Sequence, residues 1–392
     1  MPSWYPNEDD YTGIGGTFVR EHAKAVALGN DVMVLFPYFY VINFSDFIGS
    51  IKNLIPVKTS ALEEGIEVTR VKIPVLRIAI RYLGFMTNTF LPLLCYLFVS
   101  MVLFMRIRRR FNPHIIHAHV SFPAGVAGAL ISKVFSIPLI ISEHAGPFSQ
   151  LMPTKIHKYL VGYSLKTAFK VLPVSKFLKM QIEMDFKIQK FEIIPNVVDN
   201  KIFYPAIGDQ VKNDIINILF VGLFFPNKQI PILLEAISLL KKEGTRDFKL
   251  HIVGHERHLG AEYRAVARKL GIGDIVIFLG EKKKNEVADF MRHCSFLVLP
   301  SMEETFGCVV IEAMSCGKPV LATRCGGPEE IINNENGILV KPGDVKAMKD
   351  GLNFMINNYS RFDSDKIARN CSDLYSLNAV GERLAIIYKA AL

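Results

Sequence analysis

Two glutamates, Glu304 and Glu312, stand eight residues apart in the stretch PSMEETFGCVVIEAMSCGKPV at 300–320. The apolar runs SFLVLP and PVLAT flank it, a pattern that predicts strand, loop, helix, turn and strand. A helix that begins near Gly307 offers its first amides and the positive end of its dipole to a phosphate. At 1.5 Å per residue, Glu312 lies about 7 to 8 Å from Gly307 along the axis. One carboxylate then reaches a group beside the phosphate and the other reaches hydroxyls further along, as a nucleotide sugar would require.

Glutamates also occur at helix starts because the dipole favours them, so the remaining sequence must decide. Short apolar strands alternate with helical patterns twice along the chain, which predicts βαβ units and parallel sheets. We expect strands at 31–36, 65–75, 114–120, 137–142, 169–175, 216–222, 248–254, 275–280, 295–300 and 319–323. The fold class is therefore α/β, with two Rossmann-like, doubly wound domains that face an interdomain cleft beyond the strand ends.

A stretch rich in Pro, Asn and Asp at about 200–215 predicts the linker between the domains. We expect a first domain at 1–205, which the last helix at 377–392 joins, and a second domain at 206–376. A doubly wound sheet has its first strand near its centre, yet no apolar strand precedes MPSWYPNEDD. The hypothesis is a start codon assigned too late or a truncated protein, with a gap in the first sheet. Mass spectrometry of the native N-terminus tests it.

Composition excludes several classes of protein. The 392 residues are 50% hydrophobic and 21% charged, as in folded globular proteins. The net charge of +9 suits phosphorylated ligands or an anionic membrane, and the absence of a zinc finger or RNP-type motif argues against nucleic acid. The six cysteines form no CxxC pair, and no secretory signal peptide is evident, which favours free thiols in a reducing cytoplasm.

The stretches ETFGCVVIEAMSCGKPVLAT and GGPEEIINNENGILVKPGD resemble the E-x7-E donor-site signature of the retaining, nucleotide-sugar-dependent glycosyltransferases of family four, which have the GT-B fold. Further matches follow the family's order over nearly the whole chain: GTFVREHAKAVALGNDVMVL, HIIHAHVSFPAG, SEHAGPF, VLPVS, IIPNVVD, VGLFFPNKQI and LHIVG. The resemblance implies that a sugar moves from a nucleoside diphosphate, UDP or GDP, to an acceptor hydroxyl. It implies a donor on the second domain and an acceptor on the first.

The resemblance also implies roles for single residues. Glu304 would contact the donor sugar, Glu312 would hold the ribose, and Lys228 would neutralise the departing phosphate, where a fixed cation favours the transition state. His119 would be catalytic, and His144 would face the sugar and the acceptor. The remaining donor-binding positions are Gly222, Thr305, Phe306, Gly307, Cys308 and Val309, whose loop amides would cradle the diphosphate.

Three positions depart from the family pattern. Leu223 replaces an arginine, and the loss of one charge-assisted hydrogen bond to phosphate would forfeit about 1.5 to 3 kcal/mol. Glu256 and Val197 each stand where glycine is commoner. Weak donor binding, or a substitute basic residue, follows from the first departure.

The glycines of GIGGTF, Gly15 and Gly16, open a helix and could let backbone approach the ligand, although a simple turn also explains them. His114, His117 and His119 have no carboxylate or cysteine nearby in sequence, which favours buried imidazoles over a metal site. The Asp-x-Asp spacing of Asp363 and Asp365 falls in a late helical segment. We therefore expect a metal-independent enzyme without a cofactor.

The segment 82–105 carries no charge over 24 residues and runs into RIRRR. A spanning helix would split the first sheet across the membrane, and Asn88 and Pro92 interrupt the pattern. A buried helix and an interfacial helix with arginines on anionic headgroups both keep the fold. The second would make 82–110 a membrane contact of a cytoplasmic enzyme on the inner face, with a glycan or lipid-linked acceptor in cell-surface polysaccharide or glycolipid assembly. A UDP-sugar 2-epimerase and a catalytically silent nucleotide-sugar-binding protein are the alternatives.

Overall fold

The computed structural model describes residues 1–3, 16–42, 57–76, 90–206, 215–244 and 247–392. The chain divides into two compact units. Unit 1 comprises Met1–Val174, Leu178–Ile194 and Gly381–Leu392, and unit 2 comprises Ser175–Phe177 and Pro195–Val380. The boundary after Ile194 precedes the linker expected at 200–215, whose described part belongs to unit 2.

The described residues of unit 1 form two separate three-stranded sheets. In the first, β1 (Met33–Ile42) pairs in parallel with β3 (Ile66–Leu76), which pairs in antiparallel with β2 (Val57–Glu63). The second is parallel and runs in the order β4 (Ile116–His119), β5 (Leu139–Glu143) and β6 (Lys170–Pro173). The expected strands are all present, whereas β2 was not predicted, because its sequence VKTSALE lacks a clean alternation of apolar and polar residues.

The two sheets of unit 1 border a common cavity. A cavity of about 740 Å³ is lined by Val34 and Leu35 of β1 and by Ile116 and His117 of β4. At the far end of β4, His119 N donates to Met1 O at 2.9 Å, and Ser3 N donates to His119 O at 3.0 Å. Among the described residues, Pro2 thus forms a parallel bridge with His119, and no strand of either sheet pairs with both β1 and β4.

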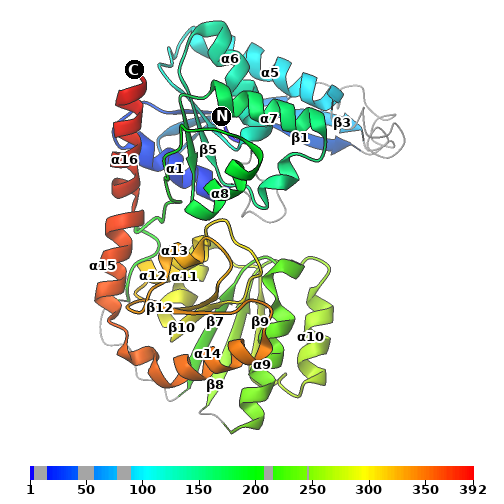
Figure 1. Cartoon of the computed structure of the whole chain (residues 1–392), viewed down its shortest axis with the longest axis vertical. Helices are drawn as coiled ribbons and strands as arrows, with labels where there is room; N and C mark the ends of the chain where they lie inside the picture. The colour runs from blue at the N-terminus through cyan, green and yellow to red at the C-terminus, as the bar shows by residue number, and fades with distance from the viewer. Residues whose placement is uncertain (4–15, 43–56, 77–89, 207–214, 245–246) are drawn as a thin grey trace. The chain divides into compact units, whose positions relative to one another are not determined.

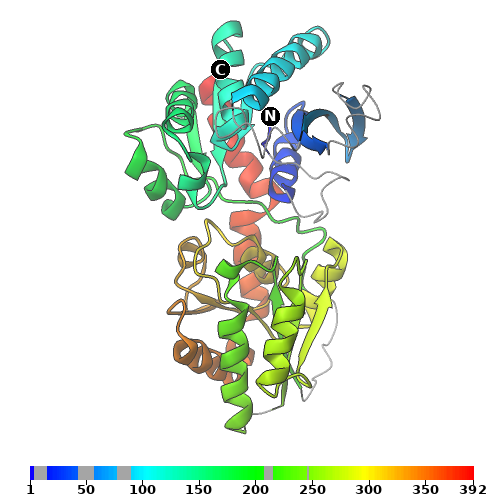
Figure 2. The ribbon, with the colours of Figure 1, turned by 90° about the vertical axis from the view of Figure 1, so that its right-hand side faces the viewer.

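The helices of this half of the chain are α1 (Thr17–Ala27), α5 (Phe90–Arg108), α6 (Val126–Phe135), α7 (Lys155–Thr167), α8 (Lys176–Asp185) and, at the end, α16 (Leu377–Ala391). Helix α5, cyan in Figures 1 and 2, packs against β1 and α6. The interruption expected at Pro92 was wrong: Pro92 is the third residue of α5, in the first turn, where a missing amide hydrogen breaks no helical bond. Asn88 lies outside the described residues.

Unit 2 is built on one parallel sheet in the order β12-β11-β10-β7-β8-β9. These strands are β7 (Ile216–Val221), β8 (Phe248–Val253), β9 (Val276–Gly280), β10 (Phe296–Leu299), β11 (Val320–Thr323) and β12 (Gly337–Val340). The central strands β10 and β11 are buried along their full length, which explains why they read as unbroken apolar runs. Strand β12 was not predicted, since it is only four residues long and lies between a turn and a polar stretch.

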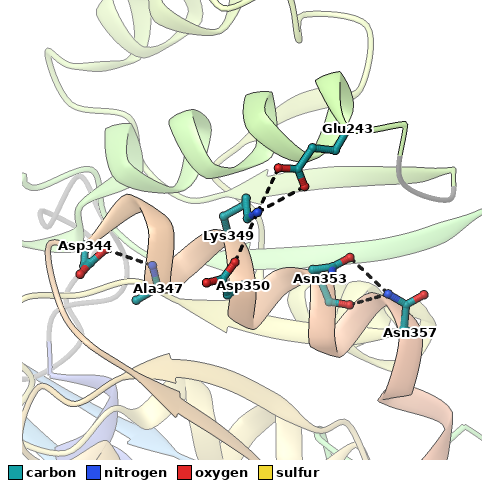
Figure 3. A network of polar contacts seen from close by, with 7 residues as sticks. All are labelled: Glu243, Asp344, Ala347, Lys349, Asp350, Asn353 and Asn357. Carbon is teal, nitrogen blue, oxygen red and sulfur yellow. Dashed lines mark hydrogen bonds and ion pairs between the residues drawn. The ribbon is translucent and has the colours of Figure 1, made fainter.

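The helices of unit 2 are α9 (Ile230–Lys242), α10 (Gly260–Lys269), α11 (Lys284–His293), α12 (Cys308–Ser315), α13 (Pro328–Ile331), α14 (Val345–Asn358) and α15 (Ser364–Tyr375). Helices α9 and α14 lie side by side against the sheet (Figure 1). Asp344 caps α14 by accepting from Ala347 N at 3.0 Å, and Lys349 joins Glu243 at 3.0 Å (Figure 3). Such exposed pairs contribute little, so buried Leu352 and Met355 supply most of the contact energy.

All six cysteines lie in the described residues, and their thiols are free. Burial raises the pKa of Cys294, Cys308, Cys316 and Cys325 to about 12 and also raises the pKa of Cys371. Cys95 is exposed on α5. Among the described helices, none combines the length and the apolar character that crossing a bilayer demands.

Candidate active site

The loop between β10 and α12 carries the first predicted site of unit 2. Gly307 adopts φ 92° and precedes α12, and Gly317 adopts φ 72° just after it. Only glycine enters this left-handed region without strain, so the two glycines set both ends of the helix. The predicted helix from Gly307 to Cys316 is thus confirmed to within one residue, and Glu304 lies in the loop before it.

Glu304 and Lys228 meet in unit 2. The Lys228 Nζ atom donates to Glu304 Oε1, and Ser301 Oγ donates to the same oxygen at 2.7 Å. Lys228 ends the short 3-10 helix η4 (Pro226–Lys228) that follows β7. The two side chains are 19% and 14% exposed, which leaves them accessible but partly shielded from water. The structure therefore brings together two residues to which the resemblance assigns one site.

The backbone of the Glu304 loop is fixed by a second loop that follows β11. Glu304 N donates to Cys325 O at 2.8 Å, and Gly327 N donates to Glu304 O at 2.8 Å. A Cβ atom on Gly327 would stand 2.4 Å from Phe306 Cα, which only glycine avoids. We did not predict Gly327 or Ser301 as site residues, although a Gly-Gly-Pro run directly after a strand is a signal for such close backbone contact.

Contacts to neighbouring residues fix the end of the loop before α12, at Thr305, Phe306 and Gly307. Ser175 Oγ donates to Thr305 O at 2.6 Å, and the Phe306 side chain is buried against Tyr375 with ring centroids 5.9 Å apart. Val310 N donates to Gly307 O at 2.9 Å, so the amides of Gly307, Cys308 and Val309 remain ahead of the first helical bond. Three amides ahead of the first helical bond, together with the helix dipole, have the chemistry that suits a phosphate.

Glu312 lies on α12 and is half-buried. The charges of Glu312 and Glu304 add to burial in raising the pKa of the Cys308 thiol to about 12, so both carboxylates lie near this thiol. Asn196 Nδ2 also contacts Cys308 Sγ at 3.2 Å. The two motif glutamates are thus placed around the first turn of α12, as their spacing predicts.

The departure at Leu223 lies in the loop after β7, next to the loop after β8. Phe224 N donates to His255 O at 3.1 Å, and a Cβ on Gly254 would stand 1.8 Å from Gly222 O. The Arg257 guanidinium lies 4.3 Å from the centroid of the Phe225 ring. A cation therefore stands beside the loop that lacks the family arginine.

The other departures have structural roles. Both carboxylate oxygens of Glu256 accept from the Arg264 guanidinium, which ties the loop after β8 to α10. This pairing leaves the Glu256 charge compensated. Val197 is buried in unit 2, which accounts for an apolar side chain there.

A cluster of imidazoles forms the predicted site of unit 1. His119 ends β4, His144 follows β5, and His119 Nδ1 lies 3.0 Å from His144 Nε2. His117 stacks on His119 with centroids 4.4 Å apart, as expected for side chains on one face of a strand. Burial, strengthened by the neighbouring imidazoles, holds the pKa of His117 and His119 well below the usual value. His114 is exposed and does not join the cluster.

Glu143, which we did not predict, ties together the loops that carry these histidines. Its carboxylate accepts from Ser121 N at 2.8 Å, from Ser121 Oγ, from His144 N at 3.0 Å and from Ala145 N at 2.9 Å. Burial raises the pKa of Glu143, against the effect of these hydrogen bonds. The glutamate of SEHAGPF is therefore part of the scaffold of the site.

Gly16 begins α1 with φ 75°, and its carbonyl accepts from Val19 N at 2.9 Å. This geometry is that of a helix start, where the left-handed backbone favours glycine. Gly15 lies outside the described residues.

Comparison with known proteins identifies the family. The model of the family described as "Glycosyltransferase Family 4" matches residues 64–202, and that described as "Glycosyl transferases group 1" matches residues 208–371. The chain belongs to glycosyltransferase family four. Family-four glycosyltransferases are nucleotide-sugar-dependent enzymes, and both predicted sites, His119 with His144 and Glu304 with Lys228, fall inside the matched residues.

Two curated relatives and a solved structure support this assignment. An uncharacterized glycosyltransferase of Methanocaldococcus jannaschii is 36% identical over 247 residues, which cover 62% of this chain and 66% of the relative. The N-acetyl-alpha-D-glucosaminyl L-malate synthase of Bacillus anthracis is 25% identical over 297 residues, 69% of this chain and 76% of the relative. The structure of Anabaena HepE in complex with UDP and glucose superposes with TM-score 0.69 and 18% identity, covering 95% of each chain. The last likeness shows that this glycosyltransferase has the GT-B fold.

Within the described residues of this glycosyltransferase, no group of three or more His, Cys, Asp and Glu side chains has the geometry of a metal site. Asp363 caps α15 by accepting from Lys366 N at 2.9 Å, and Asp365 lies in the first turn of that helix. The Asp-x-Asp spacing is thus used to begin a helix.

Proposed function

We propose that the protein is a retaining glycosyltransferase that moves a sugar from UDP or GDP to an acceptor hydroxyl. The observation that carries the proposal is the contact between Lys228 and Glu304 at the start of α12. It joins a cation suited to a departing phosphate to a carboxylate suited to sugar hydroxyls. Support for a UDP donor comes from HepE, whose structure holds UDP and glucose.

The roles in unit 2 follow from charge. As the glycosidic bond breaks, negative charge grows on the leaving diphosphate, and Lys228 with the amides of Gly307, Cys308 and Val309 stabilises it. Glu312 holds the ribose and Glu304 the donor sugar. In this proposal, these groups stabilise the leaving diphosphate without a metal ion or cofactor. The acceptor oxygen attacks from the face that the phosphate leaves and gives its proton to the departing phosphate oxygen, which gives retention without a protein nucleophile.

Arg257 compensates for the departure at Leu223. Its guanidinium is placed on Phe225, in the loop next to Leu223, and the neighbouring Glu256 is already paired with Arg264. Arg257 is therefore not neutralised by the adjacent carboxylate and can donate to a phosphate or to the nucleoside.

In unit 1, we assign His119 to the transferred sugar and His144 to the acceptor side. The acceptor is a glycan or a lipid-linked glycan of the cell surface. Support for the lipid comes from α5, where the side chains of Leu94, Phe98 and Met105 are 45%, 70% and 46% exposed. Their spacing puts them on one face, and exposed Arg106 and Arg108 follow at the helix end. Such a face suits the anionic inner surface of a cell membrane.

The test is saturation-transfer NMR with UDP-glucose, UDP-galactose, UDP-N-acetylglucosamine and GDP-mannose, on wild type and Glu304→Ala. We expect one donor to bind, with its sugar contacts weakened by the substitution. The anomeric configuration of the product then tests retention. Conversion of the donor sugar without an acceptor would instead identify the 2-epimerase. If no donor binds to folded protein, the silent alternative, which Leu223 favours, would replace the proposal.

A further inference from the structure

Two buried imidazoles share one hydrogen bond at the carboxyl end of the β4-β5-β6 sheet. His119 Nδ1 and His144 Nε2 are 3.0 Å apart, and the residues are only 6% and 7% exposed. Burial and the neighbouring imidazoles depress the pKa of His119, so this ring is neutral near pH 7. The bond therefore contains a neutral His119 ring.

A neutral imidazole has one N–H and one nitrogen lone pair. If His119 Nδ1 carries the proton of the shared bond, His119 Nε2 is a bare acceptor. If His144 Nε2 carries it, His119 keeps its own proton on Nε2 and presents a donor. The residue that supplies this one proton thus decides the polarity of the other His119 nitrogen.

The surrounding side chains hold this pair in place. His22 of α1, fully buried, lies edge-on to both rings, with centroids 5.5 Å from His119 and 5.2 Å from His144. His117 stacks on His119, but its own nitrogens contact Tyr388 OH at 2.5 Å and Ser142 Oγ at 2.8 Å. His117 therefore confines His119 without competing for the shared proton.

The backbone of His144 is fixed as well. Its amide and that of Ala145 both donate to the buried Glu143 carboxylate. Because the same carboxylate binds Ser121, two residues after His119, the loops that follow β4 and β5 are coupled. The two imidazoles therefore keep their separation without any substrate.

We propose that His144 is a positioning residue that sets the tautomer of His119. His144 donates Nε2–H to Nδ1 of His119, so that His119 presents Nε2–H to the substrate. The choice of tautomer rests on the proposed function, because the oxygens of a nucleoside-diphosphate sugar accept hydrogen bonds and a lone pair would repel them. At metal sites, a residue that hydrogen-bonds the far ring nitrogen of a ligand histidine fixes the tautomer of that histidine in the same way.

The experiment uses full-length protein labelled with ¹⁵N-histidine. Two-bond ¹H–¹⁵N spectra separate protonated from unprotonated ring nitrogens, and the spectrum of His119→Gln assigns the His119 signals. We expect wild-type His119 to be protonated at Nε2 and unprotonated at Nδ1. Protonation at Nδ1 would overturn the proposal, and this result needs no variant.

Variants of His144 test the cause. In His144→Leu, we expect His119 to lose its single tautomer, whereas His144→Gln restores it, because the glutamine amide also donates. Tyr388→Phe is the control, since it removes a contact of His117 and leaves the shared bond intact. An unchanged His119 tautomer in folded His144→Leu would contradict the proposal.

Turnover separates this proposal from the function on which it rests. We expect His144→Leu to lower kcat by about tenfold and His144→Gln to recover most of it. A change of tautomer with unchanged kcat would support the positioning by His144 but remove the catalytic role of His119. Donor binding to wild type tests the proposed function separately, because the tautomer of His119 is measured on protein without donor.

Discussion

Lys228 donates to Oε1 of Glu304 although the two residues are 76 positions apart in the chain, and Ser301 donates to the same oxygen atom. Both charges are partly shielded from water, at 19% and 14% exposure. Each compensates the other, so the removal of either leaves a half-buried charge beside the proposed phosphate site. The contact is therefore the point at which substitutions in unit 2 should have the largest effect.

Replacement of Lys228 by Met should lower kcat by about 10²- to 10³-fold, the usual effect of removing one group that stabilises transition-state charge. The control is Lys242→Met, which changes an exposed lysine at the end of α9. Steady-state kinetics with the donor identified by NMR measures both. A loss below tenfold would mean that Lys228 does not stabilise the leaving group.

The substitution Leu223→Arg should tighten donor binding at least tenfold, because a charge-assisted hydrogen bond contributes about 1.5 to 3 kcal/mol. Arg257→Ala should weaken binding in wild type, and its effect should shrink in the Leu223→Arg background, as a double-mutant cycle by calorimetry would show. Arg268→Ala, in the last turn of α10, is the control. Strictly additive effects would contradict the compensation by Arg257.

Replacement of Gly327 by Ala should lower the free energy of unfolding by about 1 to 3 kcal/mol, since the new methyl group overlaps the Phe306 backbone. It should also weaken donor binding, because the Glu304 loop must move. Gly29→Ala is the matched control, as its Cβ would meet nothing within 4 Å. Urea denaturation measures both variants, and equal stabilities would show that the loop after β11 yields easily.

Stability should fall on acidification below about pH 6.5, the usual pKa of histidine. The pKa of His117 and His119 is held well below that value in the folded protein. The unfolded chain therefore takes up protons that the folded chain does not, and the free energy of unfolding falls by up to about 1.4 kcal/mol per pH unit for each group. In His117→Asn this slope should decrease, whereas His258→Gln, at an exposed site, should leave it unchanged. A slope equal in all three proteins would exclude these imidazoles as its cause.

The exposed face of α5 should bind anionic vesicles at low salt and release them at high salt. Phe98→Asp should weaken binding about tenfold or more, because one buried aromatic side chain contributes about 1.5 to 3 kcal/mol. Leu62→Asp, at another exposed apolar residue of unit 1, is the control. Flotation with phosphatidylglycerol vesicles measures this, and wild-type protein that stays unbound would rule out the membrane contact.

The sequence predicted the parts of the fold that local pattern determines. Buried parallel strands appear as apolar runs, and the two glycines around α12 mark its ends because their backbone angles require glycine. Strand β2 could not be predicted, since its hairpin partner rather than its own pattern makes it a strand. We expected Pro92 to interrupt the helix, but a proline in the first turn of a helix breaks no helical hydrogen bond.

The candidate site was predicted only in part, for a related reason. Motif residues such as Glu304 and Lys228 are visible in sequence, but their contact is a tertiary one. Glu143 gains its role from Ser121 on another loop, and Ser301 gains its role from Glu304 in its own loop, so neither residue type reveals it. Gly327 meets the Glu304 loop, and only its Gly-Gly-Pro run hints at that contact. The shared hydrogen bond of His119 and His144 likewise depends on the pairing of β4 with β5, which places the ends of the two strands next to each other.

Five of the six thiols are kept protonated by a raised pKa, whereas Cys95 is exposed on α5. Maleimide reagents react with thiolates, so they should modify Cys95 first. Cys95 is three residues from Phe98 and thus a neighbour on the outer side of the helix. The native protein therefore carries its own attachment point for a polarity-sensitive fluorophore, which would report contact of α5 with lipid without an engineered cysteine.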